Sequence, residues 1–226
     1  GRLTHMGSIS TTASETFMKH NTNRGFEINR EVQRGQIKLY KKYGIPVRRA
    51  SIMTAFGCNF EGEIAPQLVV DRLKEILNIA DEEGTPIEIL SIADTMGWAA
   101  PNGIKQVVGK VRETWPDKRI CLHLHDTRGM GVANVYAGLE MGVDLFDSSV
   151  AGLGGCPFAA LKGAAGNVCT EDIVFLCNEH GIETGIDLDA LIEVARLAED
   201  IVGHPLPGSI MHAGSLTQYK VSQAAE

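Results

Sequence analysis

Short aliphatic runs alternate with longer amphipathic stretches along most of this chain. An aliphatic run bounded by polar residues and glycines is typical of a strand, and an amphipathic stretch of roughly ten residues or more is typical of a helix. The alternation therefore predicts repeated βα units around a parallel sheet. The predicted strands are residues 8–12, 47–53, 87–92, 120–125 and 145–150. The predicted helices are residues 28–43, 66–83, 102–115, 131–142, 169–180 and 188–202.

The number of βα units decides the fold class. Five units can be recognised, whereas a closed (β/α)8 barrel has eight strands. We therefore predict an α/β fold of the (β/α)8 TIM-barrel type that is incomplete, with about five of the eight βα units present. An open doubly wound sheet is the alternative, because it needs no further strands. Residues 1–8 are interpreted as a cloning remnant, residues 9–202 as a partial barrel catalytic domain, and residues 203–226 as a C-terminal tail too rich in proline and glycine for regular structure.

Composition and charge narrow the function classes. The chain has 226 residues, 44% of them hydrophobic, and a formal net charge of -7. No basic stripe is present for a nucleic-acid backbone, and no apolar run approaches the roughly 18 residues of a membrane helix. The five cysteines show no CxxC spacing, which argues against a disulfide framework and against a cysteine-based zinc site. We expect a cytoplasmic protein that binds neither nucleic acid nor membrane.

Two histidines two positions apart end the fourth predicted strand. Successive side chains of a strand point to opposite faces, so His123 and His125 project the same way, with Cα atoms roughly 6.5 Å apart. Two imidazoles at that separation can converge on one metal ion. The alternative is a pair of structural histidines bonded to their neighbours, which we would favour for an isolated pair of this kind.

The run after the fifth predicted strand supplies further candidate chemistry. Three of the four residues before Cys156 are glycines, so the loop could carry this thiol over a site as a nucleophile or as a general acid and base. A buried apolar cysteine is the alternative, but the GLGGCP segment offers little apolar surface to hold the sulfur. Asn167 then lies at a helix start, where a plain capping role is the alternative to a functional one.

These motifs together resemble one family. HLHDTRGMGVANVYAGLEMGVDLFDSSVAGLGGCPFA followed by GNVCTED is similar to the 3-hydroxy-3-methylglutaryl-CoA lyases, and ASETFMKHN, GCNFEG and the DTMG turn also match. The resemblance implies a divalent metal, Mg²⁺ or Mn²⁺, with His123, His125 and Asn167 as its ligands. It also implies Cys156 as the catalytic thiol, and Asp94 as an active-site acid or base.

The resemblance further implies a retro-Claisen cleavage of 3-hydroxy-3-methylglutaryl-CoA into acetyl-CoA and acetoacetate. His123, as a metal-bound base, or Asp94 would deprotonate the hydroxyl, and Cys156 would return a proton. The partner is then an acyl-CoA. The residues expected to bind the substrate are Thr95, Arg48, Gly154 and Gly155, with Arg49 and Lys162 as further phosphate contacts.

One part of the family pattern has no counterpart. In this family the first barrel strand ends in an Arg-Asp pair, whose Asp is a metal ligand, and the present sequence enters the pattern at what should be the fourth strand. Two imidazoles and an amide supply no negative charge, so we expect weak metal affinity and little or no acetoacetate release from this chain alone. Exposed sheet edges would favour a homo-oligomer, either a dimer or a strand-exchanged assembly.

Two other readings of the chain stay open. One is a related enzyme with another acyl partner, such as a citramalyl-CoA lyase, a longer-chain hydroxyacyl-glutaryl-CoA lyase or a Claisen condensing synthase, because pocket selectivity for one methylene is worth only about 1 to 3 kcal/mol. The GGCP loop argues against the synthases. The other is a non-catalytic barrel fragment that associates with itself.

Overall fold

The computed structural model describes residues 5–154, 166–217 and 219–220. Five parallel strands form one sheet in the order β1-β2-β3-β4-β5, so every strand pairs with its neighbour in sequence. The strands are β1 (Gly7–Thr12), β2 (Val47–Met53), β3 (Ile89–Ala93), β4 (Arg119–His123) and β5 (Leu145–Asp147). All five predicted strands are confirmed. In the described residues the sheet is open at β1 and β5.

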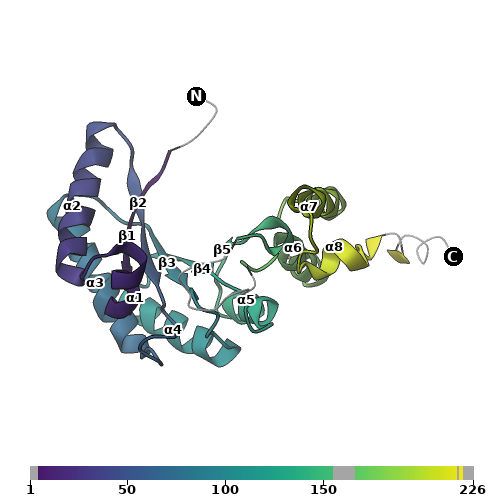
Figure 1. Ribbon diagram of the computed structural model, residues 1–226, viewed down its shortest axis with the longest axis horizontal. Helices are drawn as coiled ribbons and strands as arrows, with labels where there is room; N and C mark the ends of the chain where they lie inside the picture. Colours follow the sequence, from purple (N-terminus) through teal and green to yellow (C-terminus); the bar gives the residue numbers. More distant parts are fainter. Residues whose placement is uncertain (1–4, 155–165, 218, 221–226) are drawn as a thin grey trace.

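Helices follow the strands as the pattern predicts. They are α1 (Glu15–Thr22), α2 (Phe26–Lys42), α3 (Pro66–Glu82), α4 (Pro101–Thr114), α5 (Gly131–Glu140), α6 (Thr170–Glu179), α7 (Leu188–Val202) and α8 (Ser209–Ala213). Figure 1 shows α2 to α5 following one side of the sheet in an arc, with α6, α7 and α8 beyond β5. This is the layer arrangement of a βα barrel over five of its units.

The sheet has one apolar face and one polar face. Alternate residues of β2, β3 and β4, such as Ile52, Leu90 and Leu122, are fully buried and belong to the main hydrophobic cluster with the helices. Residues between them, such as Arg49 and His123, point to the other face and line a cavity. The period-two alternation of a strand thus separates the core from the candidate site.

The structure departs from the predictions in element boundaries and in one additional helix. The fifth strand ends at Asp147 rather than at residue 150, because residues 150–152 form a short 3-10 turn in which Ala151 has a φ of 53°. The first strand begins at Gly7, so two of the eight residues that we set aside from the fold lie in the sheet. Helix α1 was not predicted; the Ser14 hydroxyl caps it by accepting a hydrogen bond from the Phe17 amide at 3.0 Å.

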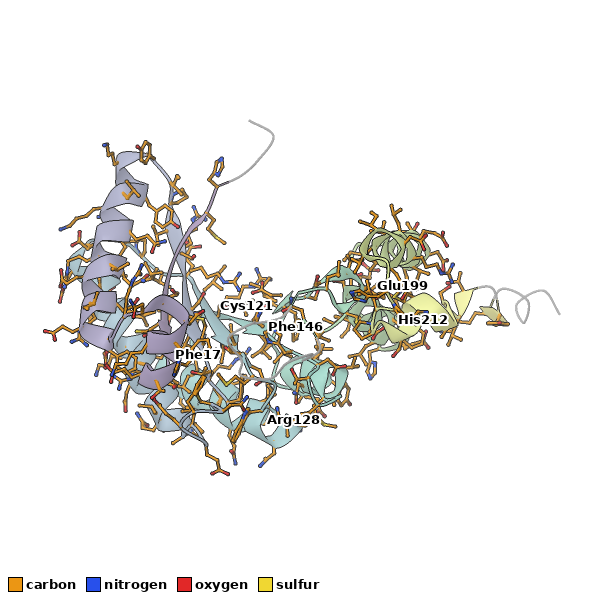
Figure 2. All side chains as sticks on the ribbon, in the orientation of Figure 1. Phe17, Cys121, Arg128, Phe146, Glu199 and His212 are labelled. Carbon is orange, nitrogen blue, oxygen red and sulfur yellow. The ribbon has the colours of Figure 1, made fainter. Side chains whose placement is uncertain are left out.

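The prediction that residues 203–226 lack regular structure is wrong over α8. The Asp172 carboxylate accepts hydrogen bonds from the Ser209 and Ile210 amides, and Met211 is fully buried. Figure 2 shows Glu199 of α7 beside His212 of α8, and the Glu199 Oε2 and His212 Nε2 atoms are 3.8 Å apart. Tertiary contacts therefore form a helical turn that local composition disfavours.

No helix within the described ranges is long and apolar enough to cross a membrane.

Candidate active site

A cavity of about 560 Å³ lies on the polar face of the sheet. Its walls come from all five strands and from the loops that follow three of them. The lining residues are Met6, Ser8, Arg49, Ser51, Met53, Ser91, Ala93, Thr95, His123, His125, Asp147 and Asn167. Parallel strands bring their carboxyl ends to one edge of the sheet, which is where βα-barrel enzymes place their chemistry.

The two predicted histidines share this cavity. Their ring centroids are 5.1 Å apart with an interplanar angle of 67°, which confirms that His123 and His125 point the same way. His125 is buried, and its Nδ1 lies 2.8 Å from the carbonyl oxygen of Asp94. A carbonyl can only accept a hydrogen bond, so the neutral ring carries its proton on Nδ1 and leaves Nε2 with a free lone pair. Burial lowers the pKa of His125, which favours this neutral form.

The other histidine belongs to a charged network. His123 Nδ1 lies 3.3 Å from Asp147 Oδ2, and the Arg49 guanidinium bonds both carboxylate oxygens of Asp147. The same guanidinium donates to Ser91 Oγ at 2.6 Å and contacts the sulfur of Cys121, which Figure 2 labels in the middle of the sheet. Burial alone would raise the pKa of Asp147, but the bonds from His123 and Arg49 outweigh it and hold that pKa below its usual range. Asp147 is therefore ionised.

Asn167 stands against the second histidine. A backbone bridge joins it to His125, and its Nδ2 donates to the Leu153 carbonyl at 3.0 Å. Its Oδ1 is buried and has no hydrogen-bond partner among the described residues. An unsatisfied buried oxygen is costly, so it is typical of an atom that awaits a ligand. A plain capping role is not seen, because α6 begins after Cys169 and its cap has no side-chain hydrogen bond.

Two glycines let the chain approach Asn167 closely. A Cβ on Gly154 would lie 2.8 Å from Asn167 Nδ2, and Gly154 has a φ of +85° that disfavours any other residue. A Cβ on Gly166 would lie 2.0 Å from the carbonyl oxygens of Gly152 and Gly154. The loop that follows β5 is thus held against the segment that carries Asn167.

His123, His125 and Asn167 form a ligand set that fits a divalent ion, although none of the three is a carboxylate. Within the described parts of the chain, no group of three or more His, Cys, Asp or Glu side chains could hold a metal. Two imidazole nitrogens and the free Asn167 oxygen form a neutral set of three, to which substrate oxygens or water could add. His123, His125 and Asn167 could therefore hold Mg²⁺ or Mn²⁺.

The structure does not bring the Asp94 carboxylate to the cavity. Its two oxygens accept hydrogen bonds from the Trp98 and Ala99 amides at 2.7 and 3.1 Å, which fixes the loop after β3. Burial raises the pKa of Asp94 to about 6 despite these two bonds. The Asp94 carbonyl oxygen, in contrast, contacts the site through His125 Nδ1 at 2.8 Å. A role as acid or base stays a prediction.

The residues predicted to contact the substrate differ in where they lie. Thr95 lines the cavity, and its Oγ1 accepts a bond from the Thr54 amide at 2.8 Å. Arg48 does not line it: this exposed side chain pairs with Glu88 at 3.6 Å, near the start of β2. Arg49 lies in the cavity but is engaged by Asp147, so it is not free to meet phosphates. Gly155, Cys156 and Lys162 lie outside the described residues.

The contact of Asp147 with His123 was not predicted from the sequence. The register pairs His123 directly with Asp147 across β4 and β5, which places both side chains on one face. The FDSSV run contained the residue, but only the strand pairing shows which histidine it meets. The partner Arg49 is 98 residues away in sequence.

Comparisons with known proteins agree with this geometry. A family described as HMGL-like matches residues 6–198. The cytoplasmic 3-hydroxy-3-methylglutaryl-CoA lyase of Rattus norvegicus is 38% identical over 186 residues, covering 82% of this chain and 52% of that protein. The hydroxymethylglutaryl-CoA lyase of Bacillus subtilis is 36% identical and covers 88% of this chain and 64% of its own length.

A solved structure shares the fold over most of this chain. It is an HMG-CoA lyase from Acinetobacter baumannii in complex with coenzyme A and 3-methylmalate, with a TM-score of 0.82 and 36% identity. The match covers 94% of this chain and 67% of that one. The chain spans about half the length of the mammalian relatives it matches. The alternative of an open doubly wound sheet is therefore set aside, and the chain belongs to the HMGL-like family, with the fold of the HMG-CoA lyase barrels.

Proposed function

We propose that this chain carries the metal-binding part of a lyase that cleaves 3-hydroxy-3-methylglutaryl-CoA into acetyl-CoA and acetoacetate. His123, His125 and Asn167 hold Mg²⁺ or Mn²⁺ in this proposal. The observation that carries it is the buried Asn167 Oδ1, which lacks a hydrogen-bond partner among the described residues and stands beside two histidines engaged at Nδ1. Both Nε2 atoms and this oxygen are then left for one ion.

Each of these residues has a separate proposed role in a retro-Claisen reaction. A bound divalent ion would polarise the hydroxyl and carbonyl oxygens of the substrate. The Asp94 carbonyl keeps His125 in the tautomer that offers Nε2, and Thr95 lines the substrate side of the cavity. Cys156, which follows the glycine-rich GLGG run in the sequence and lies outside the described residues, would return a proton to the acetyl-CoA enolate. The complex of the Acinetobacter relative with coenzyme A supports an acyl-CoA as the substrate class.

A related acyl-CoA lyase, acting on citramalyl-CoA or a longer-chain substrate, is the second candidate, because pocket selectivity for one methylene is worth only about 1 to 3 kcal/mol. A self-associating fragment is the third. It is favoured by the edges at β1 and β5, which lack a further strand among the described residues and which a second copy could cover. We expect a homo-oligomer in the cytoplasm, the location in the name of the Rattus relative.

Manganese binding tests the proposal without requiring turnover. Titration of the metal-free protein with Mn²⁺, followed by electron paramagnetic resonance, should show one site that Asn167→Ala weakens by about tenfold or more. Asn134→Ala is the matched control, because Asn134 is buried, its Oδ1 is also unpaired, and it lies outside the cavity. Equal Mn²⁺ affinity in wild type and Asn167→Ala would overturn the site.

Turnover is measured separately. Acetoacetate release from 3-hydroxy-3-methylglutaryl-CoA tests the reaction, and citramalyl-CoA in its place tests the second candidate. Sedimentation of the chain alone tests the third. Manganese binding combined with turnover of citramalyl-CoA only would keep the metal site and replace the substrate.

A further inference from the structure

The two histidines of the site are held at Nδ1 by different kinds of acceptor. His125 is held by a backbone carbonyl, which no substitution removes. His123 is held by a side chain, Asp147, which in turn is bonded by Arg49. Only the first of these arrangements is built into the main chain.

We propose that Asp147, fixed by Arg49, is a positioning residue that sets the tautomer of His123 so that its Nε2 is free to bind the metal. This inference rests on the proposed function, because it assigns a role at the same site. It adds two residues, neither of which is itself a ligand.

The hydrogen-bonding capacity of the two side chains supports a proton on Nδ1 of His123. An ionised carboxylate has acceptors only, so a neutral imidazole bonded to it places its proton on Nδ1. Metal-bound histidines commonly have such an outer acceptor, which also makes the imidazole a stronger ligand. Asp147 and His123 are direct neighbours in the strand register, at a spacing of roughly 4.8 Å between strands. Their contact therefore follows from the sheet itself.

Arg49 explains why the carboxylate stays in place. Its guanidinium bonds Asp147 and Ser91 from the neighbouring part of the polar face, and its side chain is 19% exposed. One Asp147 oxygen, Oδ2, is shared between Arg49 and His123. Asp147 also places a negative charge next to the ligand set of His123, His125 and Asn167, which carries no negative charge itself. The positive charge of Arg49 offsets part of the charge of Asp147.

The same hydrogen-bonding capacities predict how Asp147→Asn changes the tautomer of His123. Arg49 has donors only, so it turns the amide oxygen toward itself. The amide nitrogen then faces His123 and donates to Nδ1. His123 must move its proton to Nε2, which blocks the atom that would bind the metal.

The test begins with the metal-free protein, in which nitrogen NMR reports the tautomer of each histidine. At a pH of about 8, where imidazoles are ordinarily neutral, wild-type His123 should carry its proton on Nδ1, and Asp147→Asn should move it to Nε2. His125, held by its backbone carbonyl, should not change. Mn²⁺ affinity should then fall about 10- to 100-fold.

Asp144→Asn is the matched control. Asp144 precedes β5, and its exposed carboxylate pairs with Arg119 at 2.9 Å, outside the cavity. It should leave both the tautomer and the Mn²⁺ affinity unchanged. A merely structural role of Asp147 would lower stability without moving the proton of His123.

Failure of the two proposals can be told apart. Wild-type His123 protonated on Nε2, or an unchanged tautomer in folded Asp147→Asn, overturns the positioning role whatever the metal does. If Asp147→Asn does not fold, the wild-type spectrum alone decides the tautomer. Absence of Mn²⁺ binding in wild type overturns the proposed function, and an Nδ1 proton on His123 would still show that Asp147 orients the ring.

Discussion

The two faces of the sheet are stabilised by different kinds of interaction, although the same strands form both. On the helix side, Ile52, Leu90 and Leu122 are fully buried in a continuous apolar cluster. On the cavity side, Arg49 donates hydrogen bonds to Asp147 and Ser91, and His123 lies 3.3 Å from Asp147 in the same polar network. Non-directional burial therefore supplies the stability, and directional bonds supply the geometry of the site.

The largest effect should come from the apolar face. Leu122→Ala removes a fully buried side chain of β4 and should lower the free energy of unfolding by about 2–5 kcal/mol, since it leaves a cavity between the sheet and α5. Ser51→Ala, on the cavity side of β2, should change it by less than about 0.5 kcal/mol. Urea unfolding followed by circular dichroism measures both. Similar losses in the two variants would contradict the contrast between the faces.

The buried carboxylate behind the site should make stability depend on pH. Because burial raises the pKa of Asp94 from 3.8 to about 6, the folded protein binds a proton there that the unfolded chain releases. This stability is fully present below a pH of about 4 and is lost as the pH rises through about 6. The loss is on the order of 3 kcal/mol.

Unfolding free energies of wild type and Asp94→Asn at several pH values measure this effect as a difference in slope. Asp144→Asn should change the slope in the opposite sense, because the hydrogen bond from Arg119 lowers the pKa of Asp144 and its contribution is lost as the pH falls. Parallel curves for wild type and Asp94→Asn would refute the assignment.

Glycine-to-alanine substitutions near the cavity and in a covering helix should change the free energy of unfolding in opposite directions. Gly166→Ala would place a Cβ 2.0 Å from two backbone oxygens and should cost about 1–3 kcal/mol while displacing Asn167. Gly35→Ala lies within α2, where a Cβ meets nothing within 4 Å, and should stabilise the protein by about 0.4–1 kcal/mol. Thermal unfolding of the two variants decides the sign. A stabilising Gly166→Ala would show that the loop has room.

The smallest contrast concerns two ion pairs, one with Asp147 at the end of β5 and one with Asp144 just before β5. Arg49→Met leaves the half-buried Asp147 without its arginine and should cost about 1–3 kcal/mol, below the full cost of breaking a buried pair because Asp147 keeps some access to water. Arg119→Met removes the partner of exposed Asp144 and should cost about 0–1 kcal/mol. Urea unfolding in low and high salt compares them. An Arg119→Met loss as large as that of Arg49→Met would remove the distinction.

Several features of the site could be predicted because they are local. Two-residue periodicity places His123 and His125 on one face whatever the rest of the chain does, and their shared cavity confirms it. The helix α1 was missed because its apolar stretch is short, although Ser14 followed by Glu15 was a usable start signal. The helix α8 could not be predicted, because Asp172, far away in sequence, supplies its hydrogen bonds.

By itself, the sequence determined the order of the five strands and of the helices α2 to α7, the shared face of the two histidines and the resemblance to the lyase family. These follow from backbone periodicity and from contiguous motifs. Only the tertiary structure decided that Asp147 and Arg49 meet beside His123, that Asp94 faces its own loop, and that Asn167 keeps an unpaired oxygen. Strand register and loop packing bring together atoms from distant segments, and a side chain's hydrogen-bond partners are set by that register rather than by its neighbours along the chain.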